Sequence, residues 1–389
     1  MNRFSDREPM GEKGAAEEHR FTTQVLPAVK ASAPAITEAA EWIRRGEIVA
    51  FPTETVYGLG ADGLNEEAVA KIFAAKGRPQ DNPLILHIAT LDMLDPLVKE
   101  VTPAQYNALQ RLWPGPITFI FEKSDRVPDR VTAGGSTVAI RMPTSEVARS
   151  LIAQAKTPIA APSANRSGRP SPTTALDVLE DMDGRIPLIL NGGACDIGVE
   201  STVVDVTEEP AVVLRPGYYP PSMLEKFFPG IHIDPALALM NGSSPASMEK
   251  STSSEEGVAP PKSPGMKYRH YAPSAEVTIY IGEENAVESR MISDFYALVE
   301  KGKKVGFMVF AEAAKKLSLL LPPEEAVIRS LGTEGRIDTM GQRIFQLLRE
   351  LDRHHCDAIF VHGIEPVGYG VAIMNRLMKA AGGKSIYVS

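Results

Sequence analysis

The sequence contains little cysteine and no long apolar segment. Cys195 and Cys356 are its only cysteines, and they lie far apart without the paired spacing of a metal motif. This argues against a disulfide framework or a zinc site, so both are expected to be reduced structural thiols. No apolar run approaches the roughly 18 uncharged residues that a membrane-spanning helix requires. Residues 1–20 also lack an apolar signal core, so the sequence predicts a soluble protein of the cytoplasm that does not associate with a membrane.

An excess of positive charge is also absent. The formal net charge is −8, which disfavours a general nucleic-acid-binding surface but permits a local basic groove. The length of 389 residues favours two domains. Composition and periodicity divide the chain into an aperiodic, mobile tail (1–23), a first domain (24–232), a linker (233–275) and a second domain (276–389). Within the linker, residues 241–262 are rich in Ser, Pro and Glu, and we expect them to be flexible.

The most informative segment covers residues 51–88. An apolar, β-rich run ends at a proline, and a polar turn containing Thr53 follows. In α/β sheets, small ligands bind in the crevice outside such strand ends. Asn65 is placed to cap a short helix that ends in the sequence KGR, residues 76–78. The two cations can bind an anion, or they can simply neutralise the helix dipole and form surface ion pairs.

A second segment, residues 158–173, favours the anion-binding interpretation. It reads PIAAPSANRSGRPSPT, an apolar run that opens into a loop rich in Ser, Asn, Arg, Gly and Pro. A structural turn uses one or two such residues, whereas this loop supplies many hydrogen-bond donors. The phosphates and ribose of a nucleotide require such donors. Together the two segments predict a nucleotide pocket.

These motifs closely resemble those of the YrdC-like family of threonylcarbamoyl-AMP synthases. The matching segments are the Lys-x-Arg and Ser-x-Asn pair, PTETVYGLG, NPLILHI, TVAIRMP, IAAPSAN and GVESTVV, and the later SPGMKYRHYAP resembles the linker of longer, two-domain members. Ordered agreement at many sites is far more specific than any single Gly-rich loop. The resemblance covers most of residues 51–215. It implies an α/β fold of the YrdC-like type, in which a twisted mixed sheet with helices forms a basic concave ligand cavity.

The second domain shows alternating strand and helix patterns. From Val277 onward, four apolar, β-rich runs are separated by helical segments. This alternation predicts a small, mostly parallel, three-layer α/β domain of the Rossmann-like type. The segment lacks a Walker loop and a complete dinucleotide fingerprint. Because His354, His355 and His362 lack convincing ligand spacing, we interpret them as structural or surface residues.

The family resemblance implies an L-threonine site. Its residues are Thr53, His87, Arg141, Ala161 (through its backbone) and Ser201. On the residues alone, a histidine in an apolar strand, such as His87, is usually a hydrogen-bonded core residue. Arg141 ends an apolar strand and needs a partner. That partner is either a ligand carboxylate, which suits the planar guanidinium, or a protein carboxylate in an internal ion pair.

The resemblance also implies an ATP site. Its residues are Lys76, Arg78, Asn82, Thr137, Ser163, Asn165, Ser171 and Arg215. Lys76 and Arg78 are in addition the expected catalytic residues, which balance the triphosphate charge as pyrophosphate leaves. For Ser201 and Arg215, an ordinary capping or ion-pair role is the alternative. Arg166 and Arg169 are placed outside the site, because exposed loop arginines are more often solvated than bound to a ligand.

The end of the linker, residues 263–273, is too polar and aromatic for a mere spacer. Tyr268, Arg269, His270 and Tyr271 are interpreted as a lid that crosses the first domain and closes over ATP. Closure excludes water from a hydrolysable adenylate. An ordinary clasp between the two domains is the alternative.

The implied reaction condenses L-threonine, bicarbonate or CO2, and ATP with Mg2+ to L-threonylcarbamoyl-AMP and pyrophosphate. This is the first stage of N6-threonylcarbamoyladenosine formation in tRNA, so the downstream tRNA-modifying transferase machinery is the expected partner, and direct contact with tRNA is left open. No covalent nucleophile is expected, and the metal ligands are not assigned.

Two other functions are compatible with the same fold. One is a hydrogenase-maturation carbamoyltransferase that forms a carbamoyl adenylate, but this sequence lacks the acylphosphatase region and the paired-cysteine zinc motifs of those longer chains. The other is a double-stranded RNA-binding or ribosome-assembly module. The overall acidity and the matches at His87 and Arg141 count against the RNA-binding module.

Overall fold

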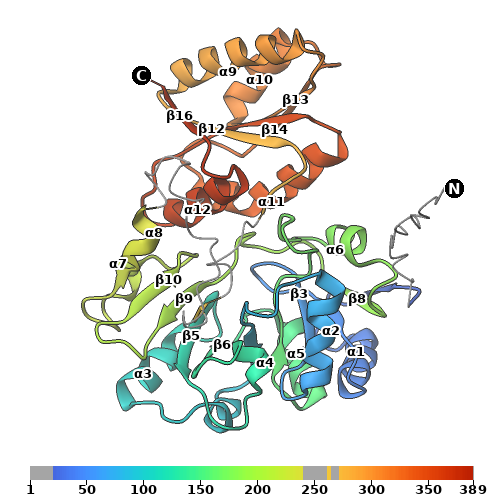
Figure 1. Cartoon of the computed structure of the whole chain (residues 1–389), viewed down its shortest axis with the longest axis vertical. Helices are drawn as coiled ribbons and strands as arrows, with labels where there is room; N and C mark the ends of the chain where they lie inside the picture. The colour runs from blue at the N-terminus through green and yellow to red at the C-terminus, as the bar shows by residue number, and fades with distance from the viewer. Residues whose placement is uncertain (1–20, 240–260, 264–270, 389) are drawn as a thin grey trace, which may run out of the picture.

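The computed structural model describes residues 21–239, 261–263 and 271–388, which form two domains (Figure 1). The first is built on an 11-stranded sheet and the second on a 5-stranded sheet. The expected tail (1–23) and flexible linker (241–262) lie mostly outside the described residues, as do Tyr268, Arg269 and His270 of the expected lid. Within the described part of the chain, no helix combines the length and apolar character needed to cross a bilayer.

The sheet of the first domain mixes parallel and antiparallel pairs, which confirms the expected fold. In spatial order its strands are β1 (Gln24–Pro27), β8 (Leu188–Asn191), β2 (Val49–Phe51), β3 (Gly58–Asp62), β7 (Ile159–Ala160), β4 (Ile85–His87), β6 (Thr137–Arg141), β5 (Ile117–Glu122), β9 (Thr202–Asp205), β10 (Val212–Arg215) and β11 (His232–Ile233). β4 and β6 run parallel, with His87 opposite Arg141. β7 runs antiparallel to β3, and the loop after β7 continues beside it, where Ser163 bridges to Gly58.

Helices cover this sheet, with short ones in its connections. They are α1 (Pro34–Arg44), α2 (Glu66–Lys76), α3 (Pro103–Leu112), α4 (Asp129–Thr132), α5 (Glu146–Ala155), α6 (Ala175–Met182), α7 (Pro221–Leu224) and α8 (Pro235–Leu239), with 3-10 turns at Leu91–Met93 and Asp95–Leu97. The predicted cap of α2 is confirmed. Asn65 Oδ1 accepts from the backbone N–H groups of Glu67 and Ala68 at 3.0 and 3.1 Å. Gly77 ends the helix at φ +61°, so Lys76 and Arg78 lie at a defined helix end.

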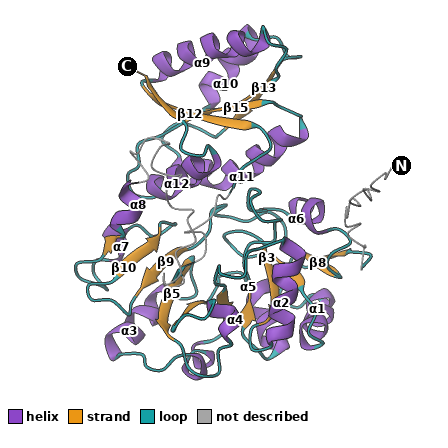
Figure 2. Cartoon of the chain, viewed as in Figure 1, coloured by secondary structure: helices purple, strands orange, loops and turns teal. Residues whose placement is uncertain are grey.

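The second domain has a parallel sheet with helices on both faces (Figure 2). Its strands, in spatial order, are β14 (Ala326–Ser330), β13 (Val305–Val309), β15 (Ala358–His362), β12 (Glu276–Gly282) and β16 (Ser385–Val388). One face carries α9 (Glu284–Val299) and α10 (Ala311–Leu320), and the other carries α11 (Ile337–Arg353) and α12 (Gly370–Ala380). The predicted three-layer α/β domain is confirmed. The prediction omitted the edge strand β16, because a run of four residues carries little pattern.

The face with α11 and α12 packs against the first domain. One apolar cluster contains Val56 and Val199 of the first domain together with Phe345 of α11. Gly198 adopts φ +81° at this contact, and a Cβ atom there would lie 2.4 Å from the carbonyl oxygen of Gly341. Such close approach of two backbones requires glycine. The domain interface therefore lies directly beside the chain segments that carry the predicted site.

Candidate active site

A pocket open to solvent lies where the polar turn after β2, the loop after β7 and the linker meet. Its lining residues are Thr53, Thr55, Val56, Gly58, Arg78, Ile85, His87, Arg141, Ala161, Pro162, Ser163, Asn165, Arg169, Ser171, Glu200, Arg215 and Tyr271. The fold thus brings together most of the site residues that the sequence predicted. Lys76, Asn82, Thr137 and Ser201 are not among the lining residues.

His87 and Arg141 lie side by side at the ends of β4 and β6. They face each other in the parallel register, and both are buried. His87 Nδ1 lies 3.2 Å from the carbonyl oxygen of Ile85, and its ring packs edge-on against Phe51. Burial, reinforced by the charge of Arg141, lowers the pKa of His87 to about 3. The imidazole is therefore uncharged at neutral pH and adds no second positive charge to this part of the pocket.

Arg141 is paired with a protein carboxylate in this structure. One of its nitrogens lies 2.7 Å from Glu54 Oε1, and another donates to Thr55 Oγ1 at 2.9 Å. This is the internal ion pair that the sequence analysis left open. Both Glu54 oxygens, and two guanidinium nitrogens of Arg141, nevertheless lack a well-oriented hydrogen bond within the described residues. Buried polar atoms are seldom left in that state, so the pair has capacity for the polar groups of a ligand.

The sequence analysis did not assign Thr55, which lines the pocket, or Glu54, which pairs with the lining residue Arg141. The available signal was their place in the polar turn directly after a buried strand. Thr53, which was assigned, mainly shapes that turn. Its hydroxyl donates to the carbonyl oxygen of Val56 at 2.7 Å and lies 2.9 Å from Thr55 Oγ1.

Lys76 lies behind the loop that follows β7, residues 163–171, which we call the pocket loop. Its ammonium group donates to the backbone carbonyls of Ser163 and Asn165, and its side chain is buried. Burial is the main cause of a pKa of Lys76 below its usual value. Asn165 completes the arrangement, because its Oδ1 accepts from the Ser163 hydroxyl. The Lys-x-Arg and Ser-x-Asn motifs therefore do meet, but Lys76 holds the backbone of the loop.

Arg78 lines the pocket at the end of α2. It donates to the carbonyl oxygens of Pro83 at 3.0 Å and Asn82 at 3.3 Å, and so supports the following turn. The amide group of Asn82 is buried without a hydrogen-bond partner within the described residues. Thr137 lies on the same face of β6 as Arg141, roughly 13 Å away along the strand.

Glu200 is a second pocket residue that the sequence analysis missed. It accepts a hydrogen bond from the Ser171 hydroxyl and another from Arg376 Nε at 2.9 Å. Burial alone would raise its pKa, but the charges of Arg376 and Arg215 lower the pKa of Glu200 below its usual value. Arg376 belongs to α12, so the second domain supplies the partner of this carboxylate. The only sequence signal was the position of Glu200 in the GVEST segment.

Arg215 and Ser201 form a buried pair at one wall of the pocket. Arg215 donates to the carbonyl oxygen and to Oγ of Ser201, each at 3.0 Å. Ser201 Oγ also lies 2.7 Å from Thr118 Oγ1. In this structure Ser201 thus orients Arg215, which reaches the pocket. Tyr271, the described residue of the expected lid, lines the pocket and stacks on Phe345 with ring centroids 5.0 Å apart.

Arg169, which the sequence analysis placed outside the site, is not a free loop residue. Its side chain lines the pocket and forms an ion pair with the buried carboxylate of Asp181 in α6. The expectation treated Arg169 as a solvated loop residue, and it failed because α6 places an acidic partner directly behind the loop. Arg166 is not among the lining residues, as expected.

The low pKa of His87 predicts an acid-dependent loss of stability. An unfolded histidine has a pKa of about 6.5, whereas that of folded His87 is about 3. Between these values the unfolded chain binds a proton that the folded protein does not, so stability falls as pH falls. We expect His87→Asn to flatten this decline by up to about 1.4 kcal/mol per pH unit. Urea unfolding at a series of pH values measures this slope. A variant as steep as the wild type would contradict the assignment, and His232→Asn, at an exposed position, is the matched control.

The fold and the pocket define a two-domain α/β protein with a pocket lined by four arginines, Arg78, Arg141, Arg169 and Arg215. Comparison with known families identifies both domains. Residues 41–217 match the family described as "Telomere recombination", and residues 223–382 match the family described as "Threonylcarbamoyl-AMP synthase, C-terminal domain".

Individual relatives agree along most of the chain. The threonylcarbamoyl-AMP synthase of Pyrococcus abyssi is 46% identical over 351 residues, which cover 90% of this chain and 95% of the relative. That of Bacillus subtilis is 41% identical over 368 residues, or 94% and 99% of the two chains. The crystal structure of P. abyssi Sua5 complexed with L-threonine superposes with a TM-score of 0.82 at 43% identity, covering 94% of this chain and 99% of that one. The chain belongs to the threonylcarbamoyl-AMP synthase family of enzymes, in its two-domain form.

Proposed function

We propose that this protein is an L-threonylcarbamoyladenylate synthase, a nucleotidyltransferase that joins L-threonine, bicarbonate or CO2, and ATP and releases pyrophosphate. Its relatives carry this name, and a related structure binds L-threonine. The observation that carries the proposal is the arrangement of the pocket. Arg141 and uncharged His87 lie side by side in it, and Arg78, Arg169 and Arg215 line it as well.

The Glu54–Arg141 pair suits the two charges of an amino acid. A free α-amino acid carries a carboxylate for Arg141 and an ammonium group for Glu54, and both protein groups have unused hydrogen-bonding capacity. A buried ion pair that opens to admit a second, opposed ion pair keeps every charge compensated. Uncharged His87 beside them can exchange a hydrogen bond with the amino or hydroxyl group of threonine without repelling the ammonium group.

The proposed reaction then depends on the proximity of the reactants and the exclusion of water more than on a nucleophilic side chain. The ammonium group of threonine releases one proton to solvent, and the resulting amine adds to the carbon of CO2 and releases a second proton to give the carbamate. An oxygen of the carbamate then attacks the α-phosphorus of ATP as pyrophosphate leaves. The carbamate readily loses CO2, so it must meet ATP in the same pocket. Arginines that line the pocket stabilise the charge that develops on the leaving pyrophosphate. Tyr271, buried at the pocket edge, helps to exclude water.

We further propose that Mg2+ accompanies ATP, since Mg2+ keeps several of its waters and usually binds substrate phosphates together with one or two carboxylates. Glu200 lines the pocket, but its oxygens already bond to Ser171 and Arg376, so the phosphates of ATP are expected to hold the ion. The product would pass to the downstream tRNA-modifying transferase machinery for formation of N6-threonylcarbamoyladenosine, which takes place in the cytoplasm. Delivery of the labile adenylate is a proposed role of the second domain.

Pyrophosphate release tests the proposed function directly. Purified protein is incubated with ATP, Mg2+ and bicarbonate, with L-threonine, with L-serine or with no amino acid. We expect release that requires both bicarbonate and threonine and that is weaker with serine. Folded protein that shows no threonine-dependent release, but binds double-stranded RNA in a salt-sensitive manner, would instead favour the RNA-binding function.

A further inference from the structure

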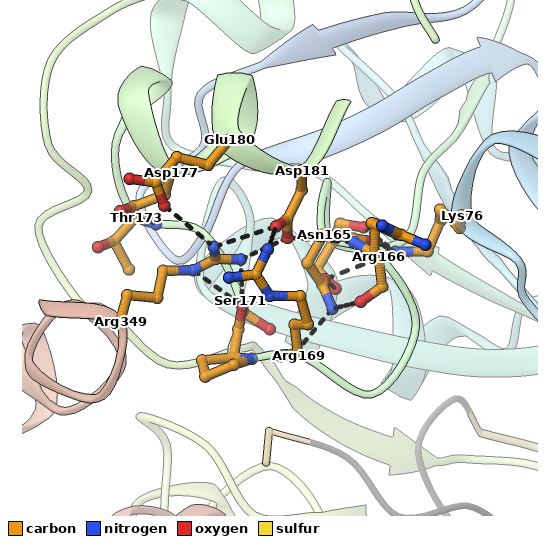
Figure 3. A network of polar contacts seen from close by, with 12 residues as sticks. Lys76, Asn165, Arg166, Arg169, Ser171, Thr173, Asp177, Glu180, Asp181 and Arg349 are labelled. Carbon is orange, nitrogen blue, oxygen red and sulfur yellow. Dashed lines mark hydrogen bonds and ion pairs between the residues drawn. The ribbon is translucent and has the colours of Figure 1, made fainter. Parts of the chain in front are cut away.

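The pocket loop, residues 163–171, is held from behind by an arginine of the second domain (Figure 3). Arg349 of α11 donates to the carbonyl oxygen of Pro170 through Nη2 at 2.6 Å and Nε at 3.1 Å. Its Nη2 also lies 2.7 Å from Asp181 Oδ2, and neither side chain of this ion pair is exposed to solvent. A fully buried pair of charges is tolerated only when both groups are well bonded, so the position of Arg349 is closely fixed.

Asp181 connects Arg349 to the loop at further points. Its Oδ2 accepts from the backbone N–H of Arg166 at 3.1 Å, and its Oδ1 accepts from the side chain of Arg169. Figure 3 shows the two arginine side chains, from different domains, converging on this one carboxylate. The second domain therefore contacts both the backbone of the loop and, through Asp181, an arginine that lines the pocket.

The part of the loop that Arg349 and Asp181 hold lies next to residues that line the pocket. Pro170, whose carbonyl Arg349 binds, stands between Arg169 and Ser171, and both neighbours line the pocket. Ser163 and Asn165, at the other end of the loop, line it as well. A displacement at Pro170 or Asp181 would thus change the side of the pocket that we assign to the nucleotide.

We propose that Arg349 is a positioning residue for the nucleotide, an inference that rests on the proposed synthase function. It does not line the pocket, and it acts by fixing the loop through Pro170 and Asp181. The second domain thereby completes the nucleotide site of the first domain. In a buried hydrogen-bond network each member helps to fix the positions of the others. Replacing Arg349 is therefore expected to displace Asp181 and the pocket loop.

The chain offers a matched control on the same helix. Arg353 lies one turn beyond Arg349 and also crosses the domain interface, where it pairs with Asp177 and Glu180 of α6. Its side chain is 38% exposed, and no bond connects it to residues 163–171. If Arg349 served only to attach the domains, Arg349→Gln and Arg353→Gln would affect the pocket alike.

Hydrogen–deuterium exchange of the full-length variants tests this without reference to activity. We expect Arg349→Gln to accelerate exchange at the amides of residues 163–171 about tenfold or more, since the Arg166 amide depends on the position of Asp181. Arg353→Gln should leave these amides unchanged. Arg349→Lys, which keeps the charge but not the planar group of donors, should give an intermediate rate and serves as the test variant if Arg349→Gln does not fold.

Kinetics supply the second measurement. We expect Arg349→Gln to raise the KM for ATP about tenfold while the KM for L-threonine stays within about twofold. Equal exchange in the Arg349 and Arg353 variants, or KM values for both substrates that rise together, would overturn the inference. Absence of threonine-dependent release in the wild type would defeat the synthase function, whereas the exchange experiment would still decide whether Arg349 holds the loop.

Discussion

Replacing Arg141 by methionine should lower kcat/KM for threonine in pyrophosphate release by at least about 30-fold and should also destabilise the protein. The substitution leaves the Glu54 carboxylate buried without its partner at 2.7 Å, and loss of one member of a buried ion pair costs about 3–5 kcal/mol. It also removes the proposed partner of the threonine carboxylate. Truncating one member of a buried, hydrogen-bonded charge pair costs about 2–5 kcal/mol of binding, or roughly 30- to 5,000-fold in kcat/KM for threonine.

A double variant separates these two effects. Glu54→Gln combined with Arg141→Met removes both charges, so much of the lost stability should return. Threonine-dependent release should remain as low as in the Arg141→Met single variant, because no group replaces the guanidinium. Arg141→Lys keeps the charge without the planar pair of donors and should be impaired in its KM for threonine above all. Threonine kinetics close to the wild type in the double variant would show that Arg141 serves only the internal ion pair.

Much of the first domain could be predicted because its signals are local. The Asn65 cap, the helix that follows and the glycine that ends it lie within one short segment, and each has a direct physical cause in neighbouring residues. The same holds for the strands that end at His87 and Arg141. Once these strands pair in parallel, the two side chains must lie together. Local pattern and the resemblance together therefore predicted that His87 and Arg141 belong to one site, and the structure places them side by side in the pocket.

The contacts across the domain interface could not be predicted in this way. Arg349 bonds to Asp181 across 168 residues, and Arg376 bonds to Glu200 across 176 residues. The sequence around an arginine on an amphipathic helix does not tell whether its side chain has a buried partner or faces solvent. The solvent-exposed interpretation is usually the correct one. Arg169 was misjudged for the same reason. Its pairing with Asp181 can be recognised only from the tertiary structure, which places α6 behind the loop.

These interdomain bonds also affect how the role of the second domain can be tested. Deleting residues 277–389 would remove Arg349, a partner of buried Asp181, and Arg376, a partner of buried Glu200. It would also expose Val56 and Val199, which pack in the shared apolar cluster. Loss of transfer to tRNA after such a deletion would thus reflect damage to the synthesis site as much as loss of delivery. Single substitutions at the interface are the more informative experiment.

Lys76→Met should cause the other large loss of activity. The lysine is expected to be catalytic, yet in this structure it donates to the carbonyl groups of Ser163 and Asn165. Each buried carbonyl left without a donor costs about 1–3 kcal/mol. Removing one preorganised donor from a site that stabilises developing negative charge typically lowers the rate about 10²- to 10³-fold, and we expect a loss of this size in kcat/KM for ATP. Lys71→Met is the matched control. Lys71 lies on the same helix and pairs with Glu47 away from the pocket, so it should retain normal activity.

The two roles of Lys76 make different predictions for binding. If it only holds a loop that binds the ribose and α-phosphate, the part that both molecules share, Lys76→Met should weaken the binding of ATP and AMP in parallel. If its ammonium group moves to the departing phosphates when ATP binds, ATP binding should weaken about tenfold or more while AMP binding changes little. Calorimetric titration with each nucleotide measures this ratio. Pyrophosphate release and ATP affinity equal to those of the wild type would contradict both roles, because Lys76 would then contribute neither to the loop nor to the charge of the leaving group.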